Sequence, residues 1–235
     1  MRSPIRTLLL AGLALACAAA DALADDYSRP AKQVIARARA ASGGTGWGML
    51  RGWHEAGLEG GVRYESWTDL LRYGLRVETH APGGVRVLGF NGAGAWRILP
   101  TGTVAPDPLI LTEARTAAFF RAGAWMFPGR FDAKGDYVGV RQSRGRAFEV
   151  IAVRPWGGAP RELWFDRRTH LLARMVERSG GAAVTTEVSD YRKVGPVLVP
   201  FRFTVQGAGG AGVERRVESL DFAPPDRAMF SLPRP

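Results

Sequence analysis

The chain has 235 residues, of which 46% are hydrophobic and 23% are charged, as in an ordinary globular protein. These proportions exclude a disordered chain, a collagen-like fibre and a protein with many membrane spans. The formal net charge of +10 comes almost entirely from arginine, since lysine stands only at Lys32, Lys134 and Lys193. Because 30 glycines and 15 prolines accompany the arginines, this basic composition is by itself weak evidence for an acidic partner.

Residues 1–24 predict a secretory signal peptide. Arg2 and Arg6 precede an uncharged apolar run over 8–20, and an A-x-A cleavage site follows at 22–24. The apolar run is shorter than the roughly 20 residues that a membrane-spanning helix needs. We therefore expect export to the periplasm as a soluble protein.

Cys17 is the only cysteine of the chain, so no internal disulfide can form. Cleavage after Ala24 removes two arginines and Asp21, which takes the formal charge from +10 to +9. We expect the mature chain, residues 25–235, to be a single domain that its own core stabilises, and a monomer. The alternative is a lipid anchor at Cys17, because residues 14–17 resemble a lipoprotein acceptor sequence.

The first predicted element of the mature chain is a helix over residues 28–42. Ser28 is a candidate N-cap, and Pro30 falls in the first turn, where a missing N–H costs little. The glycine pair at 43–44 is typical of a helix end.

A hydrophobic period of two follows, which predicts strands. In the clearest stretch the alternate apolar residues are Leu71, Tyr73, Leu75 and Val77, and the residues between them are mostly basic. Further strands are predicted at 62–65, 85–91 and 95–99, with hairpin turns at Gly83-Gly84 and Asn91-Gly92.

Residues 103–108 are predicted to be a loop and residues 111–126 a helix, with Thr112 as its N-cap. Large apolar side chains are densest in this helix. The side chains of the adjacent helix residues Phe119 and Phe120 point about 100° apart. One of them therefore needs a second apolar surface, such as a cavity or a bound chain.

Strands then continue to the end of the chain at intervals of roughly ten residues, separated by Gly, Pro and Asp-Arg turns. They are predicted at 137–143, 147–153, 161–166, 171–177, 183–191, 197–206 and 212–222. So many antiparallel strands favour a sheet that curls or closes, with the helices packed against its concave side.

The sequence offers little for catalysis, and we predict that the protein is not an enzyme and uses no metal or cofactor. It contains no zinc-ligand spacing, nucleophile elbow or phosphate loop. His54-Glu55 is a candidate acid–base pair, as is Asp166 with His170, but turn chemistry explains the second pair more simply. Nucleic acid is not an expected partner, because alternation puts the arginines and aromatics of the strands on opposite faces.

Several motifs occur in an order that resembles the LolA/LolB-like superfamily of periplasmic outer-membrane lipoprotein-sorting and lipoprotein-localisation proteins. After the first helix, which ends in ASGG, come the hairpin sequences GWGMLRGW, GGVRYESW and FNGAGAWRI. A D-x-x-T-x-L-L hairpin follows at 166–172, then a D-Y-R-x-V-G-x-x-x-V-P-x-x-F segment at 190–203. The chain closes with F-x-P-P-x-x-x-x-F-x-L-P at 222–233.

The resemblance implies a mainly β (α+β) fold, a strongly curved, incomplete antiparallel β-barrel of about 10–12 strands with helices plugging its concave face. It also implies a carrier that shields the acyl chains of lipoproteins or lipids in an apolar cavity, with residues 109–127 as a lid. The residues expected at the cavity and lid are Leu71, Tyr73, Leu75, Val77, Trp96, Ile98, Phe119, Phe120, Trp125, Phe165, Phe201 and Phe203.

Two other functions remain open on the sequence. In the first, the protein has the same fold but side chains fill its cavity, and it is an envelope protein-interaction or sensor module. Its partner would bind the basic residues Arg63, Arg72 and Arg76. An enzyme would need His54 or His170 to meet a carboxylate in one cleft. The positive charge also favours approach to an anionic membrane surface.

Overall fold

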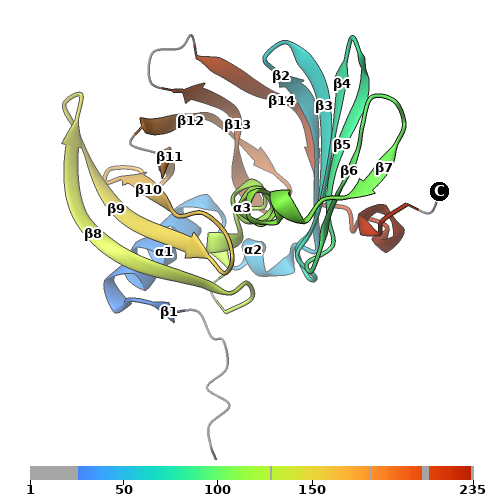
Figure 1. Ribbon diagram of the computed structural model, residues 1–235. Helices are drawn as coiled ribbons and strands as arrows, with labels where there is room; N and C mark the ends of the chain where they lie inside the picture. Colours follow the sequence, from blue (N-terminus) through green and yellow to red (C-terminus); the bar gives the residue numbers. More distant parts are fainter. Residues whose placement is uncertain (1–25, 128, 180–181, 208–211, 234–235) are drawn as a thin grey trace, which may run out of the picture.

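The computed structural model describes residues 26–127, 129–179, 182–207 and 212–233, so the predicted signal peptide and Cys17 lie outside the described residues. Within these ranges the chain forms one sheet of fourteen strands, with helices on its concave side (Figure 1). The strands of the first half are β1 (Asp26–Tyr27), β2 (Gly52–Glu59), β3 (Val62–Asp69), β4 (Gly74–Ala81), β5 (Gly84–Phe90), β6 (Ala95–Ile98) and β7 (Val104–Pro106). Those of the second half are β8 (Ala133–Ser143), β9 (Arg146–Pro155), β10 (Arg161–Asp166), β11 (Leu172–Ser179), β12 (Ala182–Val194), β13 (Val197–Gln206) and β14 (Val213–Asp221). The α-helices are α1 (Arg29–Ser42), α2 (Gly46–Met49) and α3 (Leu111–Arg121).

The sheet is open, and its strand order is β1-β8-β9-β10-β11-β12-β13-β14-β2-β3-β4-β5-β6-β7. All pairs are antiparallel except the short β1–β8 pair at one edge. This confirms the predicted curved, incomplete barrel. The prediction of 10–12 strands was too low because the edge strands β1 and β7 are too short to show a hydrophobic period, and β7 lies in the predicted loop 103–108.

Helix α1 lies where it was predicted, with Ser28 at its N-cap position, but the Ser28 side chain makes no capping hydrogen bond to the helix. The Ser28 hydroxyl accepts a hydrogen bond from the Tyr137 amide (3.2 Å), and the Ser28 amide donates to the Gly135 carbonyl (2.8 Å), so Ser28 ties the helix to β8. At the other end, Gly43 has a φ of 133° and approaches the Pro196 carbonyl so closely that a Cβ would lie 2.6 Å from its oxygen. Only glycine fits there.

Strand β4 begins at Gly74, three residues later than predicted. Leu71 and Tyr73 instead lie in the turn after β3, where Leu71 is 47% exposed and Tyr73 has a positive φ of 63°. The turn is closed by Asp69, whose Oδ1 accepts the amides of Leu71 (2.7 Å) and Arg72 (3.0 Å). The alternation over these residues therefore came from turn chemistry and not from a strand.

Helix α3 is shorter than predicted, because Gly123 with its left-handed φ of 58° separates it from a 3₁₀ turn at Ala124–Met126. It begins at Leu111 as predicted, but the segment that leads into it differs. A 3₁₀ turn at Pro108–Ile110 leads into α3, and Asp107 caps that turn by accepting the Leu109 amide (3.1 Å). Thr112 is therefore inside the helix and is not its N-cap.

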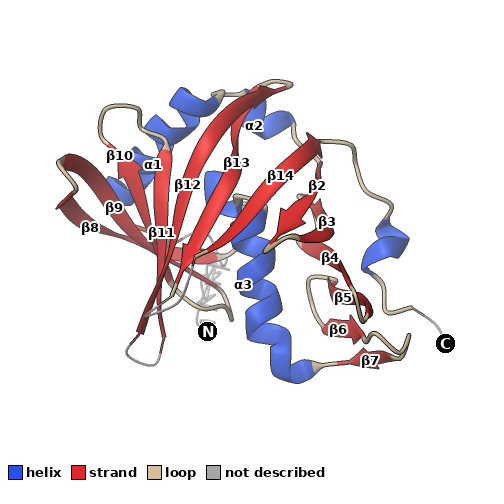
Figure 2. Cartoon of the chain, turned by 90° about the horizontal axis from the view of Figure 1, so that it is seen from above, coloured by secondary structure: helices blue, strands red, loops and turns tan. Residues whose placement is uncertain are grey.

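Helix α3 runs within the curve of the sheet, where Figure 1 shows it end-on and Figure 2 shows it from the side. Two hydrophobic clusters flank it. The larger one joins α1, the 124–127 segment and strands from the second half of the chain. The smaller one lies between α3 and strands β4–β6 and consists of Leu75, Val77, Phe90, Ala95, Ile110, Ala114 and Ala118. In the part of the molecule that the structure describes, no helix has the length and hydropathy to cross a membrane.

The hairpin after β10 confirms the structural interpretation of Asp166. Its Oδ1 accepts the backbone amides of Arg168 (2.8 Å) and Thr169 (3.0 Å), and its Oδ2 accepts Arg146 Nε (3.0 Å). Burial by itself would raise the pKa of Asp166, but the Arg146 hydrogen bond and the two amides outweigh burial and hold the pKa below its usual value. The carboxylate therefore stabilises a turn, and His170 completes that turn with a positive φ of 58°.

We expect the Asp166→Asn variant to lose stability at neutral pH and the loss to shrink in acid. Because the folded-state pKa lies below the unfolded value of about 3.9, the carboxylate stabilises the fold above pH 4, and this stability is lost as the pH falls through the folded-state pKa. Urea unfolding of both proteins at pH 7 and pH 3 measures the difference. A gap that is equal at the two pH values would contradict this role, and the exposed Asp136→Asn variant is the control.

Candidate ligand-binding site

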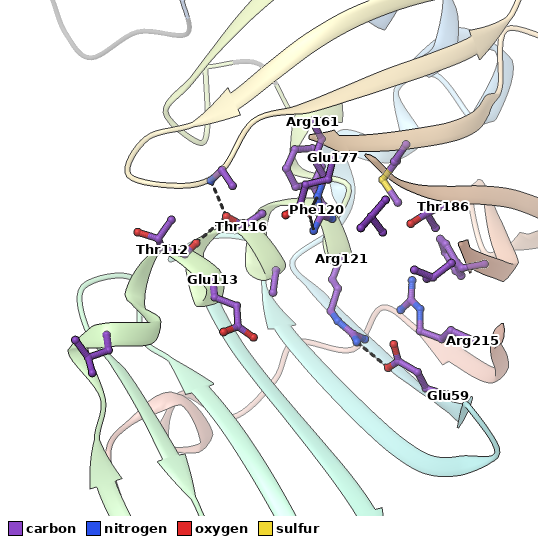
Figure 3. A pocket seen from close by; sticks show the side chains of 17 residues that line it. Glu59, Thr112, Glu113, Thr116, Phe120, Arg121, Arg161, Glu177, Thr186 and Arg215 are labelled. Carbon is purple, nitrogen blue, oxygen red and sulfur yellow. Dashed lines mark hydrogen bonds and ion pairs between the residues drawn. The ribbon is translucent and has the colours of Figure 1, made fainter. Parts of the chain in front are cut away.

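A cavity of about 550 Å³ lies between α3 and the concave face of β10–β14. Figure 3 shows it from close by. The α3 side, with the segment before it, contributes Leu109, Thr112, Glu113, Thr116, Ala117, Phe120 and Arg121. The rest of the wall comes from Glu59, Ala159, Arg161, Met175, Glu177, Val184, Thr186, Phe203, Val205 and Arg215. This volume falls within the range of about 300–1,000 Å³ that is usual for small-molecule sites.

A smaller apolar slot of about 50 Å³ adjoins the cavity and shares Phe120, Arg121, Met175 and Phe203 with it. The slot extends toward α1 and α2, and its remaining lining is Ala38, Ser42, Trp47, Trp53, Gly123, Trp125, Met126, Leu171, Leu172, Tyr191, Leu198 and Pro200.

The polar groups of the slot are satisfied within the protein. Ser42 donates to the Ala38 carbonyl (2.7 Å) and accepts the Trp47 indole N–H (2.9 Å), and the Tyr191 hydroxyl donates to the Leu172 carbonyl (2.8 Å). The slot therefore presents an apolar surface to the cavity.

A buried charge cluster stands where the cavity meets the sheet, centred on Glu55, which is only 2% exposed. Its carboxylate accepts hydrogen bonds from Trp53 Nε1 (3.2 Å), the Tyr64 hydroxyl (3.3 Å) and Arg121 Nη1 (3.3 Å), and it also pairs with Arg215. Two positive charges thus meet one buried negative charge at this point.

Glu59 supplies the second negative charge of the cluster, since its Oε2 lies 3.1 Å from Arg121 Nη2 (Figure 3). Burial alone would lower the pKa of Arg121, but Glu59 and Glu55 outweigh it, so the pKa lies above its ordinary value. Burial and the charge of Glu55 raise the pKa of Tyr64. At neutral pH Arg121 is therefore charged and Tyr64 keeps its proton.

The two arginines also pack against aromatic rings. The Arg215 guanidinium lies 3.8 Å from the centre of the Phe203 ring, and that of Arg121 lies 5.6 Å from the centre of the Tyr64 ring. Farther along the cavity, Arg161 lies 4.7 Å over the Phe120 ring and pairs with Glu177 (2.7 Å). The cavity wall thus alternates paired charges with apolar rings, and such a wall suits an amphiphile better than a wholly apolar or a wholly charged ligand.

Six of the twelve residues predicted at the cavity and lid lie in or beside this site. Phe120 and Phe203 line both the cavity and the slot, and Trp125 lines the slot. Phe119, Phe165 and Phe201 are buried in the larger hydrophobic cluster and line neither space; Phe119 packs edge-on against Phe120 and Phe165 against Trp125.

The other six lie elsewhere. Leu75 and Val77 belong to the smaller cluster under α3, Tyr73 donates from its turn to the Arg115 carbonyl (2.9 Å), and Leu71 is exposed in the same turn. Trp96 and Ile98 alternate with Ala95 and Arg97, which face α3, so they point away from it.

The outer surface of these strands is less accessible than the sequence suggested. The Trp96 indole packs over Gly89, where a Cβ would lie 2.0 Å from its ring, and donates to the Phe230 carbonyl (3.2 Å). Arg76 lies over the same indole and pairs with Glu78 (2.6 Å). Arg76 is therefore partly covered. Of the three arginines expected on the basic outer face, Arg63 and Arg72 are exposed.

His54 and Glu55 do not meet in one cleft. Consecutive strand residues point to opposite faces, so His54 lies outside the barrel, where its Nδ1 is 3.1 Å from Asp221 and its ring stacks on Trp67 at 5.0 Å. Its Nε2 lies 3.5 Å from Glu65. Among the residues that the structure describes, no group of three His, Cys, Asp or Glu residues could hold a metal ion.

The sequence pointed to Glu55 only as an acid–base candidate with His54, and it gave no sign of the other charged residues of the site: Glu59, Arg121, Arg161, Glu177 and Arg215. A signal for Glu55 was present. Glu55 lies on the same buried face of β2 as Trp53 and Gly57. A carboxylate at such a position needs a buried cationic partner. Its partners Arg121 and Arg215 stand 66 and 160 residues away, and no local pattern links them to Glu55.

No family model matches the sequence, and no curated protein does. Solved structures do resemble it. An outer membrane lipoprotein-sorting protein domain from Vibrio parahaemolyticus matches with a TM-score of 0.54 at 14% identity, over 81% of this chain and 91% of that one. A LolA superfamily protein from Nitrosomonas europaea matches with a TM-score of 0.57 at 12% identity, over 86% and 97%. A DUF1329 family protein from Desulfovibrio piger matches at 0.50 and 12%, over 83% and 94%. This chain therefore has a LolA-like fold.

Proposed function

We propose that this protein is a periplasmic carrier or binding protein that shields an acyl-bearing ligand, a lipoprotein or a lipid, in the cavity between α3 and β10–β14. The observation that carries the proposal is a cavity of about 550 Å³ that shares four lining residues with an apolar slot beside it. Each methylene moved from water into such a site contributes about 0.8 kcal/mol. The LolA-like fold supports the same function by analogy.

The two parts of the site suit the two parts of an amphiphile. The paired charges at Arg161–Glu177 and Arg121–Glu59 line the cavity and can exchange hydrogen bonds with a polar headgroup or with the peptide next to an acylated residue. The slot of about 50 Å³ holds only a few methylenes, so the rest of an acyl chain would lie along Phe120, Met175 and Phe203 in the main cavity.

Native mass spectrometry of residues 25–235, purified from a bacterial periplasm without detergent, tests the proposal. We expect a bound mass, and lipid extraction of the same sample should give a phospholipid, a fatty acid or an acylated peptide. A single ligand-free mass that takes up neither added lipid nor a synthetic lipopeptide would contradict the carrier function.

A second candidate is an envelope protein-interaction or sensor module with the same fold. One observation favours it: side chains, and not a cavity, occupy the space between α3 and β4–β6. The ligand-free outcome above, obtained with a protein that melts cooperatively, would support this module over the carrier.

A further inference from the structure

Three arginines lie near one another at the end of the barrel that carries α2: Arg39 in the last turn of α1, Arg51 after α2, and Arg130. We call this surface the basic end. Backbone contacts hold its segments together, since the Leu70 amide donates to the Arg51 carbonyl (3.1 Å) and Arg130 Nη1 lies 3.5 Å from the Leu70 carbonyl oxygen. Arg51 Nη1 also donates to the Gly48 carbonyl in α2 (3.2 Å). The last turn of α1, α2, the start of β2 and the turn after β3 thus form one surface.

Among the residues that the structure describes, no carboxylate compensates the positive charge of the basic end. Within the described ranges, none of its three guanidinium groups lies within 4 Å of a carboxylate. The nearby Asp69 is engaged by Arg72 (3.4 Å) and by the amides of its own turn. Burial lowers the pKa of Arg130, and the charges of Arg51 and Arg39 lower it further. An anion placed here would relieve this repulsion.

Exposed apolar side chains flank the arginines. Met49 is 64% exposed at the end of α2, and Leu71 is 47% exposed in the turn after β3. Behind them Arg130 lies 4.5 Å over the Phe127 ring, which packs edge-on against Trp47 at 5.9 Å. Trp47 also lines the apolar slot, so the basic end lies next to one wall of the slot.

We propose that the basic end docks on the surface of a lipid bilayer that contains anionic headgroups, with Met49 and Leu71 entering the headgroup layer. A bilayer supplies negative charge over the width of the three arginines and an apolar layer for the two exposed side chains. A free phosphate would satisfy the arginines but leave Met49 and Leu71 in water.

This orientation places α1 and α2 toward the membrane, while the N-terminal end of α3 points away from it (Figure 2). The proposal needs no ligand in the cavity. A vesicle-binding result and a ligand-binding result are therefore independent, and either one can fail alone.

Co-sedimentation with vesicles of phosphatidylcholine alone, or mixed with phosphatidylglycerol, measures the docking. We expect binding to the mixed vesicles only, weakening as salt rises. Each arginine near an anionic surface changes the partition constant roughly fivefold, so the Arg39→Gln, Arg51→Gln, Arg130→Gln triple variant should bind roughly 100-fold more weakly.

The control is the Arg63→Gln, Arg86→Gln, Arg141→Gln triple variant, which removes the same charge from exposed strand positions outside the basic end. We expect it to change binding only a few-fold. An equal loss in both triple variants would show a net-charge effect and overturn the proposal, as would the absence of binding by the unaltered protein.

Two further measurements complete the test. The Met49→Ser, Leu71→Ser variant keeps every charge and should bind several-fold more weakly, whereas unchanged binding would remove the apolar part of the proposal. Inorganic phosphate at constant ionic strength should not displace the protein from vesicles; full displacement would assign the arginines to a free anion instead. Thermal melting of each variant establishes that it is folded.

Discussion

The Glu55→Gln variant is expected to unfold with a free energy about 3–5 kcal/mol lower than that of the unaltered protein. Glu55 is the buried carboxylate between Arg121 and Arg215, and its neutral isostere would leave two guanidinium groups to repel each other, with only Glu59 to compensate them. Desolvation of a charge that has lost its partner is among the largest costs that a single substitution can cause.

Urea unfolding at pH 7 measures this loss, with Glu218→Gln as the matched control. Glu218 lies on β14 with its side chain 40% exposed and 3.5 Å from Arg216, so its removal should cost at most about 1 kcal/mol. Replacing the three most buried charges, as Glu55→Leu with Arg121→Met and Arg215→Met, should restore part of the lost stability, because the only charge left without its partner is then Glu59, whose side chain is 38% exposed and reaches water. A cost below about 1 kcal/mol for Glu55→Gln would contradict the buried charge cluster.

The Thr186→Trp variant is expected to bind an acyl ligand roughly 100-fold more weakly while it keeps its fold. Thr186 projects from β12 into the main cavity (Figure 3), so an indole there would occupy space otherwise open to three or four methylenes. At about 0.8 kcal/mol for each methylene this amounts to about 3 kcal/mol, or two orders of magnitude in the dissociation constant.

Titration with a fluorescent fatty acid measures the change, and Thr185→Trp is the control. Thr185 precedes Thr186 on the same strand and points to the opposite face, so it adds the same side chain outside the cavity. We expect the control to bind like the unaltered protein. If the two variants bound equally well, the acyl chain would lie elsewhere and the proposed site would be wrong.

Much of the secondary structure could be predicted because it follows from local patterns. Strands β10 and β13 have the predicted bounds, Arg161–Asp166 and Val197–Gln206, since turn residues mark both ends of each strand. Helix α1 was predicted to within one residue from its apolar spacing and its terminal glycines. The prediction failed for Leu71 and Tyr73, where Asp69 closes a turn that a hydrophobic period cannot reveal.

The candidate site was predicted only where aromatic density marked it. Phe120, Trp125 and Phe203 line the cavity or the slot, whereas Trp96 and Ile98 point away from α3. Alternation states that two residues share a face, but it does not state which face is concave. That choice depends on how the whole sheet curves around α3.

The sequence by itself determined the helix and strand types, the antiparallel hairpins and the resemblance that implied a curved barrel, because these depend on residues close together in the chain. Only the tertiary structure decided which half of the barrel stays open as a cavity and which half α3 fills. It also brought Glu55, Arg121 and Arg215 together, and Arg39, Arg51 and Arg130. The first set comes from three distant segments, and in the second set Arg130 is distant from the other two. The pairing of β14 with β2 and the packing of the helices, rather than any local preference, set the distances within each set.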